Sequence, residues 1–352
     1  MARHAPGLPL FSHALSMLFF VFGLLIAAQV KAQAPSPNSS ATDKQPATLR
    51  LAGPAAGVSN ALIHLANHPE DYGLSQAVEF TLWNTPDQLR ALILSDQADF
   101  IALPTNVTAN LYNRGAPLQL LNVSQWGVLW VISRDAYKST LNDFIGEEIG
   151  VPFRGDMPDI VLTHLITEAG LDPKKDFRLH YLATPMEAMQ MLIMRRLDHA
   201  LLAEPAVSMA LRKTHSFPLS AIAPELHRSV DLQQEWGRLM HTEARIPQAG
   251  IAAVGALRHQ PAVLEQFSQA YEAANRWCYQ HAQDCALEVA QAVPMLDAAA
   301  VQDSLDRQNT YFATAQEAAP ELKRFYQILL DHQPATIGGK LPEEQFYHQE
   351  QP

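Results

Sequence analysis

The chain has 352 residues, of which 48% are hydrophobic and 17% charged, and its formal net charge is −11 at pH 7. This length allows two domains with ordinary hydrophobic cores. The acidic balance argues against nucleic acid and anionic membrane surfaces as partners, because both repel a negatively charged protein. It leaves the charge of a small ligand open, since the local field at a site matters more than the net charge.

The N-terminus has the three-part pattern of a secretory signal. Arg3 precedes an apolar stretch at residues 15–28, and Val30 and Ala32 place an apolar and a small residue at positions −3 and −1 of the cleavage site. We expect cleavage after Ala32, which defines a signal peptide at residues 1–32 and an exported, periplasmic protein.

An uncleaved anchor is the alternative, because residues 8–28 are nearly long enough to span a bilayer. No cysteine directly follows the apolar stretch, so a lipid anchor is not expected. Residues 33–47 are polar and rich in Pro and Ser, a composition that predicts a disordered leader.

Strands and helices alternate regularly from Thr48 onward. The pattern predicts strands at 48–53, 78–83, 99–104, 117–125 and 127–135, with helices at 57–68, 87–97 and 105–115. It continues with strands at 147–153, 177–183 and 199–204 and helices at 141–146, 157–170, 185–197 and 206–214. A loosely patterned stretch at 215–245 separates these from a long apolar strand at 247–256 and a largely helical region at 261–331. Such alternation is typical of α/β folds with parallel sheets.

Two segments far apart in the chain repeat one pattern. Residues 88–104 and 188–205 each combine an amphipathic helix with a short apolar run closed by a proline, Pro104 or Pro205. An apolar run without alternation indicates a strand buried on both faces of a parallel sheet. Ligands of such sheets bind beyond the carboxyl ends of the strands. Two such units predict two α/β lobes that face each other across a ligand-binding cleft.

The two long apolar strands, 127–135 and 247–256, are the candidates for hinge crossings between the lobes, which would let the lobes close on a ligand. The predicted domains are lobe 1 at 48–132 and 247–335, lobe 2 at 133–246, and a C-terminal tail at 336–352.

The order of these elements resembles a known family, the periplasmic solute-binding proteins of the type II class, which have two crossovers. Within it, the chain is similar to the nitrate, sulfonate, taurine and thiamine-precursor branch. The resemblance covers residues 48–333 and rests on the order of five segments: GVSNALIHLA (57–66), ADFIALP (98–104), IGVPF (149–153), LDHALLAEPAV (197–207) and GALRHQPAVLEQFSQAYEAANRW (255–277). It implies a two-lobe periplasmic-binding-protein-like α/β fold with two hinge crossings and a helical C-terminal region.

The resemblance also implies a function, the capture of a small molecule for an ATP-driven (ABC-type) importer whose permease lies in the inner membrane. We expect a monomer without a cofactor. A sensory binding protein that docks on a membrane receptor is a second possibility. The thiamine-pyrimidine synthases share the fold, but the CCCFC motif they carry is missing here. Motifs of serine hydrolases and phosphate-binding loops are also missing, so no catalytic residue is predicted.

Candidate ligand-binding residues follow the strands, where free backbone N–H groups of the next helix face a ligand. They are Ser59, Asn60, Trp83, Asn84, Thr105, Asn106 and Trp126 in lobe 1, and Phe153, Arg154, Asp156, Thr184 and Glu204 in lobe 2. The hydroxyl and amide side chains among them are also good helix caps, which is the alternative interpretation. Trp83 is placed to stack on a ligand, although a core position is equally compatible with the sequence.

The loop after the strand at 147–153 indicates the chemistry of the ligand. Arg154 and Asp156 lie there, and Glu204 adds a second acid after a neighbouring strand. Two acids, one arginine and several aromatic residues suit a polar organic ligand with hydrogen-bond donors, such as an aromatic or heterocyclic molecule. The alternatives are a small oxyanion, and a surface pair of Arg154 with Asp156 that takes no part in binding.

The two cysteines, Cys278 and Cys285, are seven residues apart. In an unbroken helix they would lie about 10 Å apart, too far to pair. Asp284 is a good N-cap for a helix that begins at Cys285, which favours a turn between the two residues. In an oxidising compartment, we therefore expect a disulfide between them.

The histidines do not define a metal site in the sequence. His64 and His68 are four residues apart on one predicted helical face and could chelate an ion. No third ligand has a recognisable spacing from this pair, so no metal site is predicted.

Overall fold

The structure is a computed structural model that describes residues 47–217, 220, 225–308 and 310–349. The predicted signal peptide at 1–32 and all but the last residue of the predicted leader at 33–47 lie outside the described residues. The described residues fall within one compact unit, Lys44–Pro352. None of their helices has both the length and the apolar character that a bilayer crossing requires.

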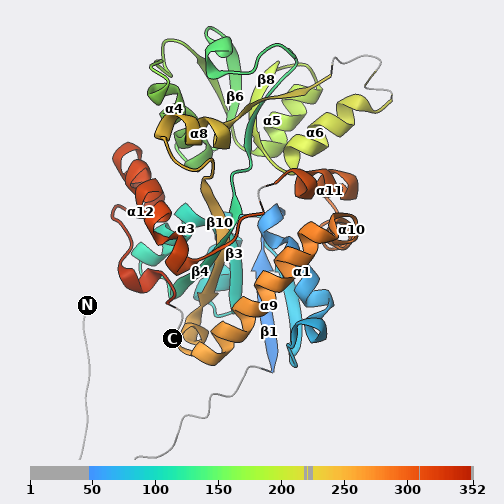
Figure 1. Ribbon diagram of the computed structural model, residues 1–352, viewed down its shortest axis with the longest axis vertical. Coiled ribbons are helices and arrows are strands. Elements are labelled where there is room, and N and C mark those ends of the chain that lie inside the picture. Colours follow the sequence, from blue (N-terminus) through green and yellow to red (C-terminus); the bar gives the residue numbers. More distant parts are fainter. Residues whose placement is uncertain (1–46, 218–219, 221–224, 309, 350–352) are drawn as a thin grey trace, which may run out of the picture. The chain divides into compact units, whose positions relative to one another are not determined.

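Two β-sheets organise the described part of the chain (Figure 1). The first has six strands in the order β11-β4-β10-β3-β1-β2: β1 (Thr48–Gly53), β2 (Ala77–Leu82), β3 (Phe100–Pro104), β4 (Leu118–Trp126), β10 (Pro247–Val254) and β11 (Ala313–Thr314). The second has five strands in the order β7-β6-β8-β5-β9: β5 (Leu129–Ser133), β6 (Glu148–Pro152), β7 (Arg178–Leu182), β8 (His199–Ala203) and β9 (His227–Asp231).

The helices flank these sheets. Between and after the strands of the first sheet run α1 (Asn60–Asn67), α2 (Pro86–Leu94), α3 (Thr105–Asn113), α9 (Pro261–Gln280), α10 (Ala282–Ala292), α11 (Ala298–Arg307) and α12 (Ala315–His332). The second sheet carries α4 (Met157–Glu168), α5 (Pro185–Ile193), α6 (Ala206–His215) and α8 (Leu232–Met240). Short 3-10 turns are η1 (Gly57–Ser59), η2 (Pro69–Tyr72), η3 (Leu141–Phe144), η4 (Gly255–His259), η5 (Pro334–Ile337) and η6 (Glu344–Phe346).

The sheets are mixed rather than wholly parallel. Strands β1, β2 and β3 run parallel, and so do β6, β7 and β8, as the alternation predicts. The two long apolar strands differ, because β10 is antiparallel to β3 and β4, and β5 is antiparallel to β8 and β9. The chain enters β5 from the first sheet and β10 from the second sheet. In both cases it arrives where the parallel strands of the new sheet end, so the entering strand runs in the opposite direction to them.

The chain passes between the sheets twice, from β4 to β5 and from α8 to β10. The two crossings lie side by side, since the N–H of Gly127 donates to the carbonyl of Ile246 at 3.0 Å. Gly127 has a φ of +58°, and a Cβ there would lie 1.7 Å from Oε1 of Gln233. This position therefore requires glycine for two reasons, its left-handed backbone and the side chain packed against it.

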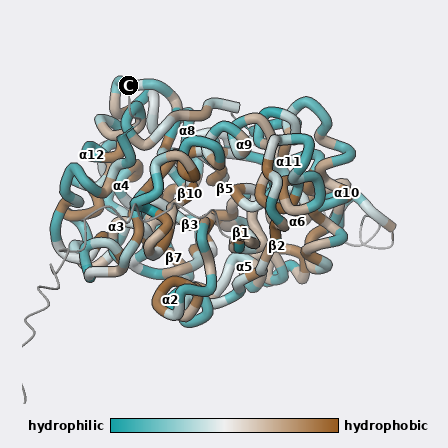
Figure 2. Tube along the Cα trace, turned by 90° about the horizontal axis from the view of Figure 1, so that it is seen from below, coloured by the Kyte–Doolittle hydropathy of each residue, from teal (hydrophilic) through white to brown (hydrophobic). Residues whose placement is uncertain are grey.

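The hydrophobic core lies between the strands and the apolar faces of the helices. Figure 2 shows apolar segments on inner strands such as β10, while much of the outer helices α8 and α12 is hydrophilic. Every residue of β10 is buried, which explains why its sequence is apolar apart from Gln248. In the first sheet, the rings of Phe100 on β3 and Phe267 on α9 stack with centroids 3.5 Å apart. The segment after α12 joins this core, because Phe346 and Tyr347 are fully buried.

The stretch at 215–245, which has no clear pattern in the sequence, contains β9 and α8. Strand β9 lies at the edge of its sheet, beside β5 only, and most of its residues are half-buried. Strand β9 also carries the arginine Arg228.

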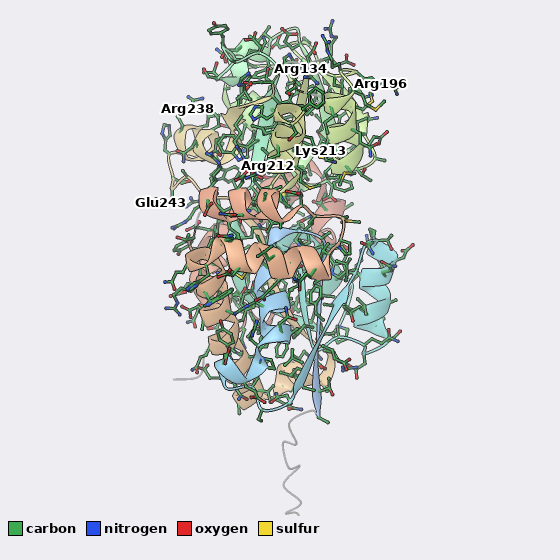
Figure 3. All side chains as sticks on the ribbon, turned by 90° about the vertical axis from the view of Figure 1, so that its right-hand side faces the viewer. Arg134, Arg196, Arg212, Lys213, Arg238 and Glu243 are labelled. Carbon is green, nitrogen blue, oxygen red and sulfur yellow. A yellow bond between two sulfur atoms is a disulfide. The ribbon has the colours of Figure 1, made fainter. Side chains whose placement is uncertain are left out.

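An ion pair between helices links the two halves of the molecule. Arg212 on α6, labelled in Figure 3, donates from Nε and Nη2 to both carboxylate oxygens of Asp303 on α11.

A disulfide joins Cys278, near the end of α9, to Cys285 in α10, with the Cα atoms 5.1 Å apart. The helices meet in a turn at His281, as the spacing of the cysteines predicts. The start of the second helix is different from the prediction, because α10 begins at Ala282. Asp284 therefore lies in the first turn of α10 and not at its N-cap. There its negative charge interacts favourably with the positive end of the helix dipole.

Candidate functional site

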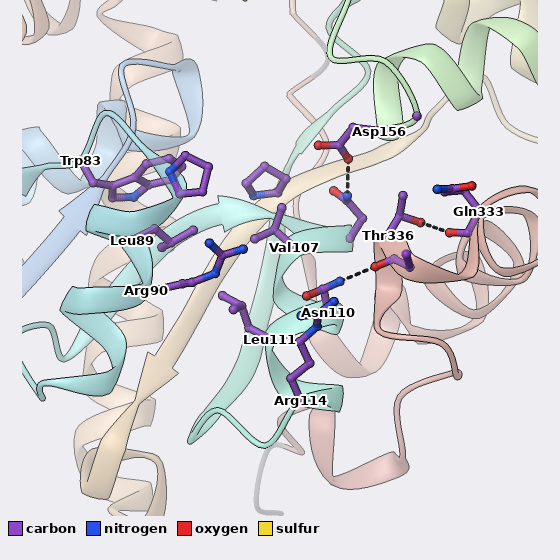
Figure 4. A pocket seen from close by; sticks show the side chains of 15 residues that line it. Trp83, Leu89, Arg90, Val107, Asn110, Leu111, Arg114, Asp156, Gln333 and Thr336 are labelled. Atoms are coloured by element: carbon purple, nitrogen blue, oxygen red, sulfur yellow. Dashed lines mark hydrogen bonds between the residues drawn. The ribbon is translucent and has the colours of Figure 1, made fainter. Parts of the chain in front are cut away.

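A cavity of about 390 Å³ opens beside the carboxyl ends of β2, β3 and β6 (Figure 4). Both halves of the molecule contribute to it, because α2 and α3 come from the first sheet and the start of α4 from the second. It is lined by Trp83, Pro86, Leu89, Arg90, Pro104, Asn106, Val107, Asn110, Leu111, Arg114, Gly155, Asp156, Gln333, Ala335 and Thr336. Of the ligand-binding residues expected from the sequence, the structure brings Trp83, Asn106 and Asp156 together here.

Asn106 and Asp156 connect the two halves across this cavity. Nδ2 of Asn106, in the first turn of α3, donates to Oδ1 of Asp156 at 2.9 Å, as Figure 4 shows. Asp156 is also the N-cap of α4, where the same Oδ1 accepts from the N–H of Met157 at 2.7 Å. Asn106 is only 2% exposed, and its Oδ1 has no hydrogen-bond partner among the described residues. A buried amide oxygen without a partner is costly, so this atom is suited to accept a hydrogen bond from a ligand.

Trp83 forms one side of the cavity. It follows β2, and its Nε1 donates to the carbonyl of Ala102 on β3 at 3.3 Å, which fixes the plane of the indole. The side chain is half-buried, and Figure 4 shows it at the edge of the cavity. A fixed and partly accessible indole offers a stacking face to a planar ligand.

Two arginines that were not predicted lie on the opposite side of the cavity from Asp156. Arg90 belongs to α2 and makes an exposed ion pair with Asp87 at 3.1 Å, which contributes little to stability. Arg114 ends α3. Asn106, Asn110 and Arg114 are spaced by four residues, so they lie along one helical face, and this polar stripe is a signal that the sequence does contain.

The loop before α4 presents its side chains to solvent. Phe153 has a φ of +59°, an unusual backbone conformation for a bulky residue, and its ring is exposed. The Arg154 guanidinium lies over the ring of Tyr181, with Cζ 4.7 Å from the centroid. Among the described residues, no ion pair joins Arg154 to Asp156, so the structure does not contain the surface pair considered as an alternative.

Beneath this loop lies a buried acid, Asp159 in the first turn of α4. Its Oδ2 accepts from the N–H of Gly155 at 2.8 Å, and its Oδ1 accepts from the Tyr181 hydroxyl at 3.3 Å. Burial raises the pKa of Asp159, while these two hydrogen bonds and the nearby Arg154 act in the opposite direction. Asp159 thus holds the turn that positions Asp156.

Glu204 is buried and already paired. Its Oε1 accepts from Nη2 and Nε of Arg228 at 2.6 and 3.2 Å, and its Oε2 accepts from the N–H and hydroxyl of Ser208. The expected second free acid at the site is therefore neutralised by a cation from β9, and Glu204 does not line the cavity.

Several of the other expected residues make hydrogen bonds within the fold. The Ser59 hydroxyl donates to the carbonyl of Pro54, and the Thr105 hydroxyl donates to the carbonyl of Pro247 on β10. Neither is a side-chain cap of its helix. Asn60 is buried as the first residue of α1. These side chains lie at the ends of strands, as expected, but outside the lining of the cavity.

The last of the expected ligand-binding residues are Thr184, Asn84 and Trp126. Thr184 is the N-cap of α5, and its side chain accepts from the N–H of Glu187. Asn84 is exposed, and its backbone N–H donates to Oε1 of Gln88. Trp126 is fully buried in the core at the end of β4, where its indole contributes to packing rather than to the surface of the cavity.

Solved structures of other proteins share the architecture of this chain. An ABC transporter protein from Parabacteroides distasonis matches with a TM-score of 0.72 and 20% identity, covering 87% of this chain and 100% of that chain. The periplasmic aliphatic sulphonate binding protein SsuA from Escherichia coli matches with a TM-score of 0.65 and 16% identity, covering 87% and 94%. The periplasmic nitrate-binding protein NrtA from Synechocystis PCC 6803 matches with a TM-score of 0.60 and 12% identity, covering 83% and 84%. No family model and no curated protein matches the sequence.

The chain therefore has the two-lobe α/β fold of periplasmic substrate-binding proteins of ABC transporters. The predicted fold class and the resemblance to the nitrate and sulfonate branch are both confirmed. At these levels of sequence identity, the likeness defines the fold, and the ligand has to be inferred from the residues of the cavity.

Proposed function

We propose that this protein is an extracytoplasmic solute-binding protein that captures a small polar organic molecule and delivers it to the permease of an ABC-type importer. The fold supports this role, because solved proteins that share it are transport-associated binding proteins. A cavity between two sheets joined by two adjacent crossings also suits reversible capture, since small rotations at the crossings would open it. The protein acts by binding and release and carries out no catalysis.

The observation that carries the proposal is the contact between Asn106 and Asp156 at the cavity. A carboxylate and an unpartnered amide oxygen, supplied by different sheets, offer two acceptors to the donors of one ligand. Trp83 adds a stacking face nearby. The ligand is therefore a small molecule with hydrogen-bond donors and a planar part, such as an aromatic or heterocyclic compound.

A small oxyanion is the second candidate, and Arg90 and Arg114 favour it. Two guanidinium groups on one side of the cavity would attract a nitrate or sulfonate group. The proteins from Escherichia coli and Synechocystis that share the fold are described as sulphonate and nitrate binders. The two candidates differ in the role of Asp156, which receives a donor from the organic ligand but repels an oxyanion.

Mass spectrometry of solutes released from native protein would identify the ligand, and calorimetry with that ligand would test the site. Asp156→Asn should weaken binding of a donor-bearing ligand about tenfold to a hundredfold, the usual range for a charged hydrogen bond. The same variant should tighten binding of an oxyanion. Glu168→Gln is the matched control, because it removes an exposed acid at the far end of α4. Unchanged affinity in Asp156→Asn would show that this cavity is not the binding site.

A further inference from the structure

A cluster of two histidines and one glutamate lies between α1 and α10, away from the cavity. Nδ1 of His64 is 2.9 Å from Oε2 of Glu288, and Nε2 of His68 is 3.0 Å from Oε1 of the same carboxylate. One potential ligand atom from each of the three residues lies within 4.8 Å of the others. The sequence shows only the two histidines, one helical turn apart. The third member comes from a helix more than two hundred residues later, so no spacing reveals it.

We propose that His64, His68 and Glu288 form a binding site for a divalent transition-metal ion such as Zn²⁺. Two imidazoles and one carboxylate are a common protein ligand set for zinc. Imidazole ligands favour this class of ion over Mg²⁺ and Ca²⁺, which prefer oxygen ligands. The three ligand atoms already converge, so binding requires small shifts of side chains and no change in the backbone.

Groups around the cluster would orient its ligands. The Tyr72 hydroxyl lies 2.8 Å from Nε2 of His64, the ring nitrogen that faces away from Glu288. Oδ2 of Asp71 lies 3.9 Å from Nδ1 of His68, again the nitrogen that does not face the glutamate. The contact of His64 with Tyr72 is of the kind that commonly orients metal-binding histidines, a hydrogen bond at the second ring nitrogen. The contact of His68 with Asp71 is too long for a hydrogen bond and places a negative charge near that ring. Each histidine is therefore placed with one nitrogen toward the common centre and the other toward a polar neighbour.

The surroundings leave one side of the site open. The indole of Trp277 stacks on the ring of His64, with centroids 3.8 Å apart and planes 8° apart, and the side chain of His64 is only 5% exposed. The side chains of Glu288 and His68 are 20% and 41% exposed. An ion could thus enter from the side of His68, and water could fill its fourth position.

The position of Glu288 is set by a covalent bond nearby. Cys285 lies three residues before Glu288, on the same face of α10, and its disulfide with Cys278 ties this helix to the end of α9. Trp277, which covers His64, is the neighbour of Cys278 in α9. The disulfide therefore fixes both the acidic ligand and the aromatic cover relative to one another. This cross-link supports a site whose geometry is prepared before the ion arrives.

In the structure, the ring nitrogens of His64 and His68 that face Glu288 form hydrogen bonds with its carboxylate. A metal would replace them, and any proton on Nδ1 of His64 or Nε2 of His68 would have to leave. The cluster without metal would instead be a hydrogen-bonded link between α1 and α10. The two interpretations differ in one measurable property, the affinity for the ion.

The test is titration of the exported chain with Zn²⁺ alone, after removal of metals with a chelator, followed by calorimetry and thermal unfolding. We expect one Zn²⁺ per chain, with micromolar or tighter affinity, and a rise in Tm that depends on the Zn²⁺ concentration. His68→Ala and Glu288→Gln should each weaken binding by at least about tenfold and remove the rise in Tm. Both side chains are partly exposed, so circular dichroism should show folded variants.

The matched control is His180→Ala. His180 on β7 faces Glu148 on β6 with Nδ1 2.9 Å from Oε1, and no third metal-ligating side chain joins this exposed pair in the part of the chain that the structure describes. This variant should bind Zn²⁺ like the unchanged protein. Failure of the unchanged protein to bind Zn²⁺ at tenfold excess would overturn the proposal. Undiminished binding in both His68→Ala and Glu288→Gln would overturn it as well. Neither result depends on the ligand of the cavity, so this test is independent of the proposed function.

Discussion

Replacement of Arg228 with alanine should destabilise the protein strongly without touching the cavity. Nη2 of Arg228 donates to Oε1 of Glu204 at 2.6 Å and to the hydroxyl of Ser208 at 2.8 Å. The side chains of Glu204 and Arg228 are 2% and 16% exposed, so the pair is almost out of contact with water. Without the arginine, Oε1 of Glu204 would be an uncompensated charge in the interior.

The expected loss in free energy of unfolding is about 3 kcal/mol, at the lower end of the range for breaking a buried ion pair. The lower end applies because Oε2 of Glu204 keeps both hydrogen bonds from Ser208. Urea denaturation of Arg228→Ala, Glu204→Gln and the double variant would measure this loss. The double variant should lose less than the sum of the single variants, since it leaves no unpaired charge.

A loss below about 1 kcal/mol for Arg228→Ala, or additive effects in the double variant, would refute this reasoning. Glu204 would then behave like a partner in an exposed ion pair. It would have to be considered again as a free acid that meets a ligand, as the sequence alone suggests.

Three further predictions concern stability. Burial lowers the pKa of His164, whose Nδ1 lies 3.2 Å from Nε2 of His332, so folding disfavours its protonation. The free energy of unfolding should therefore fall as the pH drops below 6.5, the ordinary pKa of histidine. Denaturation of His164→Gln at pH 8 and at pH 5.5 should show a smaller difference in stability than the unchanged protein shows. Peptide mapping without reductant should find Cys278 linked to Cys285, and reduction should lower the free energy of unfolding by about 2.5 kcal/mol, the estimate for so short a loop. Gly250→Ala should cost at least about 2 kcal/mol in urea denaturation, because its Cβ would lie 1.9 Å from a backbone carbonyl of β4.

The strands and helices of the regular α/β part could be predicted because burial and sequence pattern agree there. Strand β1 matches its predicted range, and β3, β6 and β8 differ from theirs by a residue at one or both ends. Strands β3, β6 and β8 are apolar runs buried along most of their length, whereas β1 alternates half-buried Thr48 and Arg50 with buried apolar residues. Strand β9 could not be found, because it lies at an edge, beside β5 only, and alternates half-buried polar residues with few apolar ones. The sequence also did not reveal that β5 and β10 are antiparallel to their neighbours, since this direction depends on which sheet the chain comes from.

The candidate site was predictable in position but not in electrostatics. Trp83 and Asn106 follow neighbouring parts of the first sheet, so strand order brings them close together. Asp156 follows β6 of the second sheet and meets them because the two sheets face each other with the carboxyl ends of their parallel strands, as the two-lobe prediction requires. The partner of Glu204 could not be foreseen, because Arg228 lies on the strand that the pattern misses. Local spacing identifies side chains on one helix, whereas pairing between elements depends on the packing of the whole fold.

The buried pair of Glu204 with Arg228 changes what the cavity offers to a ligand. With Glu204 neutralised, Asp156 is the acid among the residues that line the cavity, and Arg90 and Arg114 are its cations. Oδ1 of Asp156 already accepts from the amide of Asn106 and from the N–H of Met157, so a ligand would donate to the other carboxylate oxygen, Oδ2. Replacement of Asp156 with Asn would weaken this one charged hydrogen bond, which is why it should cost about tenfold to a hundredfold in affinity. Oδ1 of Asn106 also has no partner among the described residues, so a ligand with two adjacent donors would gain most from this site.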